Sequence, residues 1–190
     1  LELHGVVGDF TAHLDRLPAE GHRMVAFLGG TIGNLLPPER REFLLALRAA
    51  LQPGEQFLLG AGLVVDPAVL VPAYDDAAGV TAEFNRNVLH VLNRELGADF
   101  DVDEFDHKAV WDAENEWIEM HLVARRAMSV TVAELGLTVE FAAGEEMCTE
   151  VSAKFRLPGV RAMLADAGFT VMHSWADPQE RMALTLATAT

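Results

Sequence analysis

Residues 24–34 decide the fold, and they read Met24-Val25-Ala26-Phe27-Leu28-Gly29-Gly30-Thr31-Ile32-Gly33-Asn34. The first five are continuously apolar, which is typical of a strand buried on both faces of a parallel sheet. Two glycines end this run, and a helical pattern follows at 37–51, where Pro37 and Pro38 suit a first turn. A second short strand is predicted at 56–59. This alternation of strand and helix predicts a doubly wound α/β sheet.

Residues 1–20 predict one further strand and one helix of the same sheet. The apolar residues Leu1, Leu3 and Val6-Val7 precede Gly8-Asp9-Phe10, which indicates a strand that ends in a tight turn. Residues 11–20 predict a short helix.

The pattern changes after residue 64. Asp75-Asp76 predict the cap of a long helix. Three segments then alternate apolar and polar side chains as antiparallel strands do, namely 107–112, 117–128 and 129–141. Consecutive strands do not continue a strand–helix series, so we predict an inserted α+β lobe at 65–154.

The α/β pattern returns at the C-terminal end. Pro158 predicts a helix start, and residues 169–175 and 181–188 predict an antiparallel strand pair. The predicted domains are therefore a core at 1–64, the lobe at 65–154, and a return to the core at 155–190.

Composition disfavours several classes of partner. Twenty-nine acidic residues against 14 basic ones give a net charge of −15. This balance disfavours nucleic acids and anionic membranes, because both require clustered Lys and Arg. No apolar run reaches the roughly 18 residues of a membrane helix. A single cysteine, Cys148, and the lack of an export signal favour a cytoplasmic protein.

Sequence motifs for metal or nucleophilic chemistry are absent. The histidines form no His-x-His or His-Glu-x-x-His pair, so no metal site is expected. The sequence has no Gly-x-Ser-x-Gly elbow and no Walker loop. Cys148 stands beside Met147 without a basic neighbour, which favours a small buried side chain over a nucleophile.

Two loops that follow predicted strands are candidate binding sites. Asp9 and Phe10 come at the sheet edge where open α/β sheets bind ligands. The Asp9 carboxylate can accept a hydrogen bond from an exocyclic amine of a ligand, and the Phe10 ring can stack on a ligand ring. The alternative is that Asp9 caps the following helix, and spacing does not decide between these roles. In the loop 29–34, three glycines let the backbone approach a ligand and Asn34 offers both a donor and an acceptor. The alternative for this loop is a tight strand-to-helix connection.

Glu150 and Ser152 form a third candidate cluster. Positions i and i+2 of a strand point to one face, so the carboxylate and the hydroxyl would be presented together. Such a pair suits a ligand with two ring nitrogens, such as an imidazole. A solvated strand face is the commoner alternative.

Six longer motifs together resemble one family, the histidine-specific Nα-methyltransferases of ergothioneine biosynthesis. The motifs are Phe27-Leu28-Gly29-Gly30-Thr31-Ile32-Gly33-Asn34, Ala73-Tyr74-Asp75-Asp76-Ala77-Ala78-Gly79-Val80-Thr81, Phe84-Asn85-Arg86-Asn87, Asn93-Arg94-Glu95-Leu96, Phe141-Ala142-Ala143-Gly144-Glu145-Glu146-Met147, and Thr149-Glu150-Val151-Ser152 followed by Lys154-Phe155. The resemblance runs essentially from Leu1 to the end of the chain.

This resemblance implies an enzyme that uses S-adenosylmethionine to methylate the α-amine of L-histidine three times, giving hercynine. The implied fold is the Rossmann-like sheet of class I methyltransferases, incomplete at the N-terminus, with a separate substrate lobe. Asp9 and Phe10 would lie at the adenine end of the cofactor. The implied substrate-binding residues are Gly29, Asn34 and Tyr74 around the amino-acid backbone, and Glu150, Ser152 and Met120 around the imidazole.

The resemblance also implies that the family's Glu-Leu-Gly-x-Gly cofactor loop precedes Leu1. We therefore expect weak or no turnover from residues 1–190 alone, and a monomer for the full-length protein. Two alternatives stay open. One is a related methyltransferase for another amino acid, and the other is a non-catalytic binding domain.

Overall fold

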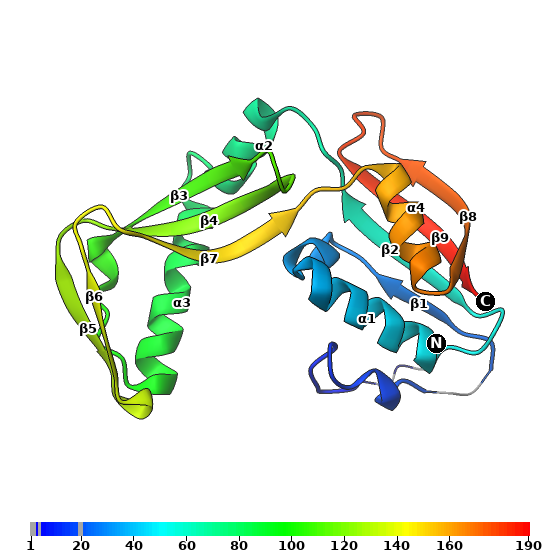
Figure 1. Ribbon diagram of the computed structural model, residues 1–190, viewed down its shortest axis with the longest axis horizontal. Helices are drawn as coiled ribbons and strands as arrows, with labels where there is room; N and C mark the ends of the chain where they lie inside the picture. Colours follow the sequence, from blue (N-terminus) through cyan, green and yellow to red (C-terminus); the bar gives the residue numbers. More distant parts are fainter. Residues whose placement is uncertain (1–2, 4, 19–20) are drawn as a thin grey trace. The chain divides into compact units, whose positions relative to one another are not determined.

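The computed structural model describes residues 3, 5–18 and 21–190, which form two compact units (Figure 1). Unit 1 comprises residues 1–64 and 153–190, and unit 2 comprises residues 65–152.

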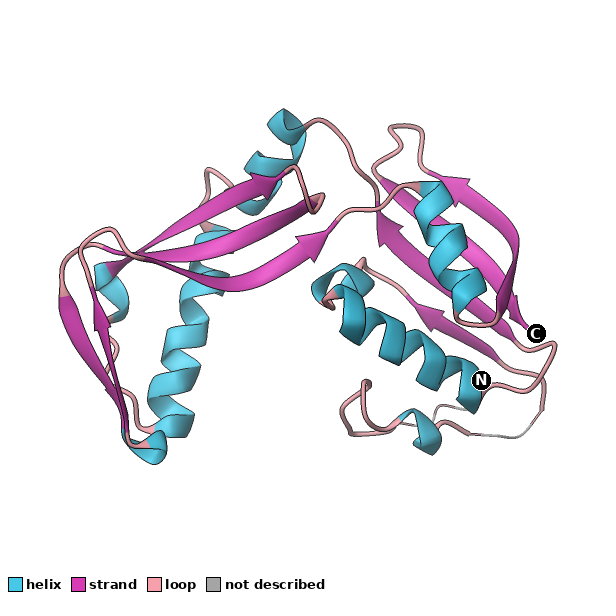
Figure 2. Cartoon of the chain, in the orientation of Figure 1, coloured by secondary structure: helices cyan, strands magenta, loops and turns pink. Residues whose placement is uncertain are grey.

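Unit 1 is built on a four-stranded mixed sheet (Figure 2). β1 runs parallel to β2, whereas β9 is antiparallel to both of its neighbours, β2 and β8. Phe57 and Leu59 of β2 and Ala187 of β9 are fully buried and form the centre of this core. In spatial order the strands are β1 (Met24–Phe27), β2 (Gln56–Gly62), β9 (Met182–Ala189) and β8 (Phe169–Ala176).

Two α-helices and two 3-10 turns accompany this sheet. They are η1 (Leu14–Arg16), η2 (Thr31–Asn34), α1 (Pro37–Ala50) and α4 (Leu157–Asp166). The buried face of α1 repeats at helical spacing through Phe43, Leu44 and Leu47. Gly168 follows α4 with a φ of +88°, the left-handed conformation that commonly ends a helix.

Unit 2 is an α+β lobe. A three-stranded sheet has the order β3 (Phe105–Asp112), β4 (Trp117–Ala124) and β7 (Glu146–Ala153), and a hairpin joins β5 (Met128–Val132) to β6 (Leu137–Phe141). The helical elements are α2 (Pro67–Tyr74), α3 (Val80–Leu96), η3 (Val102–Glu104) and η4 (Ala133–Leu135). One core cluster joins α3 to these strands, and its buried members are Leu89, Phe100, Phe105, Leu122, Ala124, Val130 and Phe141.

The predicted α/β fold with an α+β lobe is confirmed. The helix at 37–51, the strand at 56–59 and the closing strand pair form as expected. The prediction that residues 24–28 are buried on both faces is wrong, because β1 is an edge strand whose side chains alternate between exposed and half-buried. None of the helices in the described residues is long and apolar enough to span a membrane.

The predicted N-terminal strand is wrong for the residues that the structure describes. Leu3 and residues 5–7 form no strand, while Leu1 lies outside the described residues. Leu3 is 84% exposed and Val7 is 96% exposed. A strand needs a neighbouring strand to pair its backbone N–H and C=O groups, and these residues have no such pairing.

Three other predicted elements have the wrong extent. The strand expected at 117–128 ends at Ala124, the last residue of β4. The helix expected at 11–20 reduces to η1, because Leu17 precedes Pro18 and takes an extended backbone; residues 19–20 lie outside the described part of the chain. The single strand expected at 129–141 is divided into β5 and β6. Gly136 makes this break with a left-handed φ of +56°.

The long helix α3 begins at Val80, later than its predicted cap at Asp75-Asp76. Residues 67–74 form α2, which the sequence pattern did not predict. The capping role itself is confirmed for Asp76, whose carboxylate accepts the backbone N–H groups of Thr81 at 2.8 Å and Val80 at 3.1 Å. The hydrogen bonds with Thr81, followed by the one with Val80, lower the pKa of Asp76 to about 2.

A buried ion pair links the segment before β1 to the start of β2. Glu55 is 3% exposed, and its carboxylate accepts the Nε–H of Arg23 at 2.7 Å and the backbone N–H of Gln52 at 2.7 Å. The hydrogen bonds from the Arg23 side chain are the main reason that the pKa of Glu55 falls from its usual 4.5 to about 2.

We expect this pair to make unit 1 less stable in acid. A carboxyl whose pKa is lower in the folded chain stabilises the fold above its unfolded pKa, and this contribution is lost as the pH falls from about 4.5 toward 2. Melting temperatures measured across this range should fall more steeply for the wild type than for Glu55→Gln. Parallel curves for the two proteins would contradict this assignment.

Candidate functional site

The glycine-rich loop after β1 lies entirely in unit 1. Gly29 and Gly30 have φ values of +80° and +78°, a conformation that glycine adopts without a steric penalty. They turn the chain into η2, which ends at Asn34. Gly29 and Asn34, the two predicted substrate residues of this loop, are both exposed on unit 1.

Two contacts fix this loop from within unit 1. Gly33 is buried so closely that a Cβ there would lie 2.6 Å from the carbonyl oxygen of Ala153. Arg40 of α1 donates to the carbonyl oxygens of Ile32 at 3.3 Å and Leu35 at 3.0 Å. Gly33 therefore lies close to the backbone of Ala153 in the same chain. This part of the loop fits the alternative of a tight strand-to-helix connection.

Asp9 and Phe10, the predicted cofactor residues, also lie in unit 1. The Asp9 carboxylate accepts the hydroxyl of Thr11 at 2.6 Å and its backbone N–H at 2.8 Å, and these bonds lower the pKa of Asp9. Phe10 is 47% exposed and packs on Phe27 and Phe43, with ring centroids 5.4 and 6.0 Å away. Asp9 thus caps its local turn and keeps an ionised carboxylate next to a half-exposed ring.

The other four predicted substrate residues lie in unit 2. Tyr74 ends α2, and its phenol oxygen is 2.9 Å from the hydroxyl oxygen of Ser152 on β7. Glu150 is half-buried two positions earlier on this strand, and alternate positions share a face. Met120 lies on the neighbouring strand β4 and is 3% exposed. The structure brings Tyr74 and Ser152 into direct contact.

Glu150 also lines a pocket of unit 2 with a volume of about 270 Å³. The rest of the lining comes from Thr149 of β7 and from the α3 residues Phe84, Asn85, Asn87, Val88 and Val91. Phe84 is 64% exposed, so an aromatic face is available beside the carboxylate. The lining is mixed, with three apolar side chains and with the amides, hydroxyl and carboxylate of the other four residues.

A hydrogen-bond network in unit 2 was not predicted from the sequence. Asn85 is 3% exposed, and its amide nitrogen lies 3.0 Å from His107 Nδ1 and 3.1 Å from the carbonyl oxygen of His121. Its amide oxygen accepts the hydroxyl of Thr149 at 2.5 Å. One signal for this network existed in the sequence: Asn85 stands one helical turn before Leu89, on the apolar face of α3.

A cluster of titratable side chains lies on β4 and β7. His121 Nε2 is 2.8 Å from a Glu119 oxygen, and His121 Nδ1 is 2.9 Å from a Glu146 oxygen. Single ligand atoms of Glu119, His121 and Cys148 lie within 4.8 Å of one another, so the fold gathers a potential metal-binding set that sequence spacing did not reveal. Cys148 is exposed, so the prediction of a small buried side chain is wrong. Partial desolvation, and then the Glu119 charge, raise the pKa of Cys148, which disfavours the thiolate that a metal requires.

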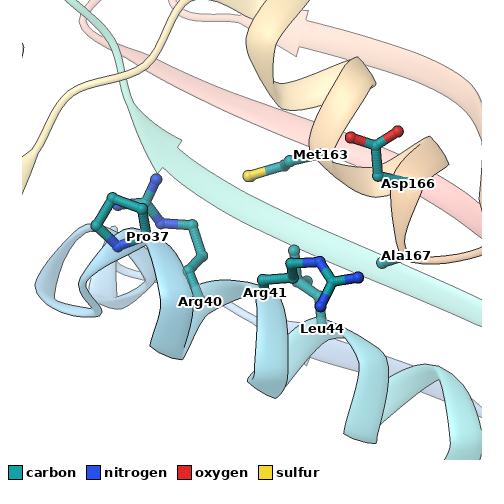
Figure 3. Close-up of a pocket in the computed structure, with 7 residues that line it drawn as sticks. All are labelled: Pro37, Arg40, Arg41, Leu44, Met163, Asp166 and Ala167. Atoms are coloured by element: carbon teal, nitrogen blue, oxygen red, sulfur yellow. The ribbon is translucent and has the colours of Figure 1, made fainter.

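A separate pocket of about 210 Å³ lies between α1 and α4 of unit 1 (Figure 3). Its lining residues are Pro37, Arg40, Arg41, Leu44, Met163, Asp166 and Ala167. None of the residues predicted to bind substrate or cofactor lines it. The Arg40 guanidinium donates to the carbonyl oxygens of Ile32 and Leu35 and lies 4.7 Å from the ring centre of Phe155. Arg40 therefore supports the glycine-rich loop structurally.

Comparison with known proteins identifies the family. A family model described as "Histidine-specific methyltransferase, SAM-dependent" matches residues 1–189. The chain is 58% identical over 187 residues to the histidine N-alpha-methyltransferase of Mycolicibacterium smegmatis and 54% identical over 187 residues to that of Mycobacterium tuberculosis. Both alignments cover 98% of this chain.

The chain spans 58% of the length of each of these two relatives. A solved methyltransferase structure, CcbJ from Streptomyces caelestis, is 16% identical with a TM-score of 0.49, and the match covers 97% of this chain and 63% of that one. The family match over nearly every residue agrees with the resemblance noted in the sequence motifs. This chain belongs to the histidine-specific, S-adenosylmethionine-dependent methyltransferases.

Proposed function

We propose that this chain carries the imidazole-binding part, and a portion of the cofactor site, of an enzyme that methylates the α-amine of L-histidine three times and yields hercynine for ergothioneine biosynthesis. The observation that carries the proposal is the hydrogen bond between Tyr74 and Ser152, with Glu150 on the same strand. The family membership of the chain supports the reaction type.

The chemistry of Glu150 and Ser152 matches a neutral imidazole, which offers one N–H donor and one nitrogen acceptor. Glu150 supplies a carboxylate to accept from the N–H. The Ser152 hydroxyl donates to the other nitrogen while its oxygen accepts from the Tyr74 phenol, which is 2.9 Å away. An analogue without ring nitrogens offers no hydrogen bond to Glu150 or Ser152, and sites built to hydrogen-bond a substrate discriminate strongly against such analogues.

Methyl transfer requires little acid–base machinery from the protein. When bound, S-adenosylmethionine supplies a sulfonium methyl group that is already activated. This chain's residues would hold the α-amine in a near-attack position to that methyl group. Each transfer would release one proton from the α-ammonium to water and leave S-adenosylhomocysteine. Asn34 and Tyr74 are proposed to hold the α-amine and carboxylate of the amino acid, with Gly29 against its backbone. Asp9 and Phe10 fit the adenine end, because an ionised carboxylate accepts from an amine beside an exposed ring.

The test is incubation of L-histidine and S-adenosylmethionine with this chain, followed by mass spectrometry of the small molecules. A parallel reaction uses the chain extended by the portion that the mycobacterial relatives have outside the matched segment. We expect successive single-methyl increments on histidine with the extended protein and weak or no turnover with residues 1–190. The proposal would be contradicted if neither protein methylated histidine. It would also be contradicted if tryptophan and tyrosine, in competition with histidine, were methylated equally well.

A further inference from the structure

Both N–H groups of the Asn85 amide and its oxygen make hydrogen bonds, and their partners lie on three different elements. The amide reaches the side chain of His107 on β3, the carbonyl oxygen of His121 on β4 and the hydroxyl of Thr149 on β7. Asn85 itself is 3% exposed. Buried amides that are fully paired hold their neighbours in one arrangement, because any displacement leaves a polar group without a partner.

The network also fixes the tautomer of His107. Its Nε2 lies 2.7 Å from the carbonyl oxygen of Tyr74, which can only accept, so Nε2 carries the hydrogen. Nδ1 is then the acceptor that meets the amide nitrogen of Asn85 at 3.0 Å. The same orientation of Asn85 places its second N–H on the His121 carbonyl oxygen, so all of these bonds agree with the Nε2–H form of His107.

This network contacts the backbones of two predicted substrate residues of unit 2, and the other two lie on the same strand as Thr149. His107 holds the backbone of Tyr74, and the Thr149 hydroxyl lies 2.9 Å from the carbonyl oxygen of Met120. Thr149 directly precedes Glu150, and Ser152 follows on the same strand. We propose that Asn85, His107 and Thr149 are positioning residues that orient this set for the imidazole ring and thereby set the selectivity for histidine.

The position of β7 explains why such an anchor is needed. β7 is the last strand in the order β3-β4-β7, so only β4 pairs with it within this sheet. Thr149 supplies a second attachment, through Asn85, to α3. Recognition by hydrogen bonds requires placement within a few tenths of an ångström, and side chains held by a supporting layer of bonds keep that placement.

The inference rests on the proposed function, and a matched pair of variants tests it. Thr149→Val keeps the shape of the side chain and removes the hydroxyl, whereas Thr149→Ser keeps the hydroxyl. We expect Thr149→Val to weaken L-histidine binding about 10-fold in calorimetry, and Thr149→Ser to stay within about two-fold of the wild type. The preference for L-histidine over L-phenylalanine should fall with Thr149→Val. A loss of stability alone would not change this preference.

Controls separate positioning from folding. Thr131→Val alters an exposed threonine on β5 and should leave binding unchanged. Melting curves establish that each variant is folded. Proton–nitrogen NMR spectra of the wild type need no variant and should show His107 as the Nε2–H tautomer.

Three results would overturn the inference. The Nδ1–H tautomer at His107 would contradict the network itself. Equal histidine affinity and selectivity for the wild type and Thr149→Val would refute the positioning role while leaving the proposed function intact. No binding of L-histidine by the wild-type chain would refute the imidazole-binding role proposed for these residues, and the inference with it.

Discussion

Glu150→Ala is expected to weaken the binding of L-histidine to the chain about 100-fold. The substitution removes the ionised acceptor for the imidazole N–H, and hydrogen bonds to charged groups contribute roughly 1.5–3 kcal/mol. Glu150→Gln keeps an oxygen acceptor without the charge, so it should retain intermediate affinity, about 10-fold weaker than the wild type. Isothermal titration with L-histidine measures both variants.

A matched control is Glu140→Ala, which removes an exposed carboxylate from β6 of the same unit. It lowers the net negative charge by the same amount, so it shows how much of any effect arises from charge alone. We expect no change in histidine affinity for this variant. If Glu150→Ala bound histidine as tightly as Glu140→Ala, Glu150 would not be an imidazole ligand.

Gly33→Ala is expected to lower the free energy of unfolding by about 1–3 kcal/mol, the usual cost of inserting a methyl group into a closely packed site. The added Cβ would lie 2.6 Å from the carbonyl oxygen of Ala153 and 3.2 Å from its nitrogen. Both are backbone atoms, so the loop or the end of β7 must move. Urea denaturation followed by circular dichroism measures the change.

Gly159→Ala provides the matched control for this prediction. Gly159 lies in α4, and a Cβ added there meets no heavy atom within 4 Å. Alanine is the better helix former, so this variant should be as stable as the wild type or up to about 1 kcal/mol more stable. Equal stability of the two alanine variants would show that the loop tolerates a side chain at Gly33.

The sequence predicted the parts of the fold that depend on local patterns. The spacing of Phe43, Leu44 and Leu47 predicts α1, and the apolar residues 57–59 predict the first part of β2, because each pattern reflects burial against a neighbouring layer. The burial of residues 24–28 could not be read in the same way. An apolar run does not reveal whether its strand is central or lies at the edge of the sheet.

In the candidate site, too, local sequence patterns predicted some features, whereas others depend on contacts between distant residues. The strand alternation of Glu150 and Ser152 predicts a shared face, but Tyr74 entered only through the family resemblance. The supporting network joins Asn85 to Thr149, which is 64 positions away in the chain, so no local pattern could reveal it. The convergence of Glu119, His121 and Cys148 likewise depends on two strands.

The central claim is that unit 2 recognises the imidazole of histidine through β7. Titration of the isotopically labelled chain with L-histidine, followed by NMR, tests it most directly. We predict shifts of the Tyr74, Glu150 and Ser152 resonances with L-histidine, and no comparable shifts with L-phenylalanine. Equal shifts with both amino acids, or no shift at these three residues, would contradict the account.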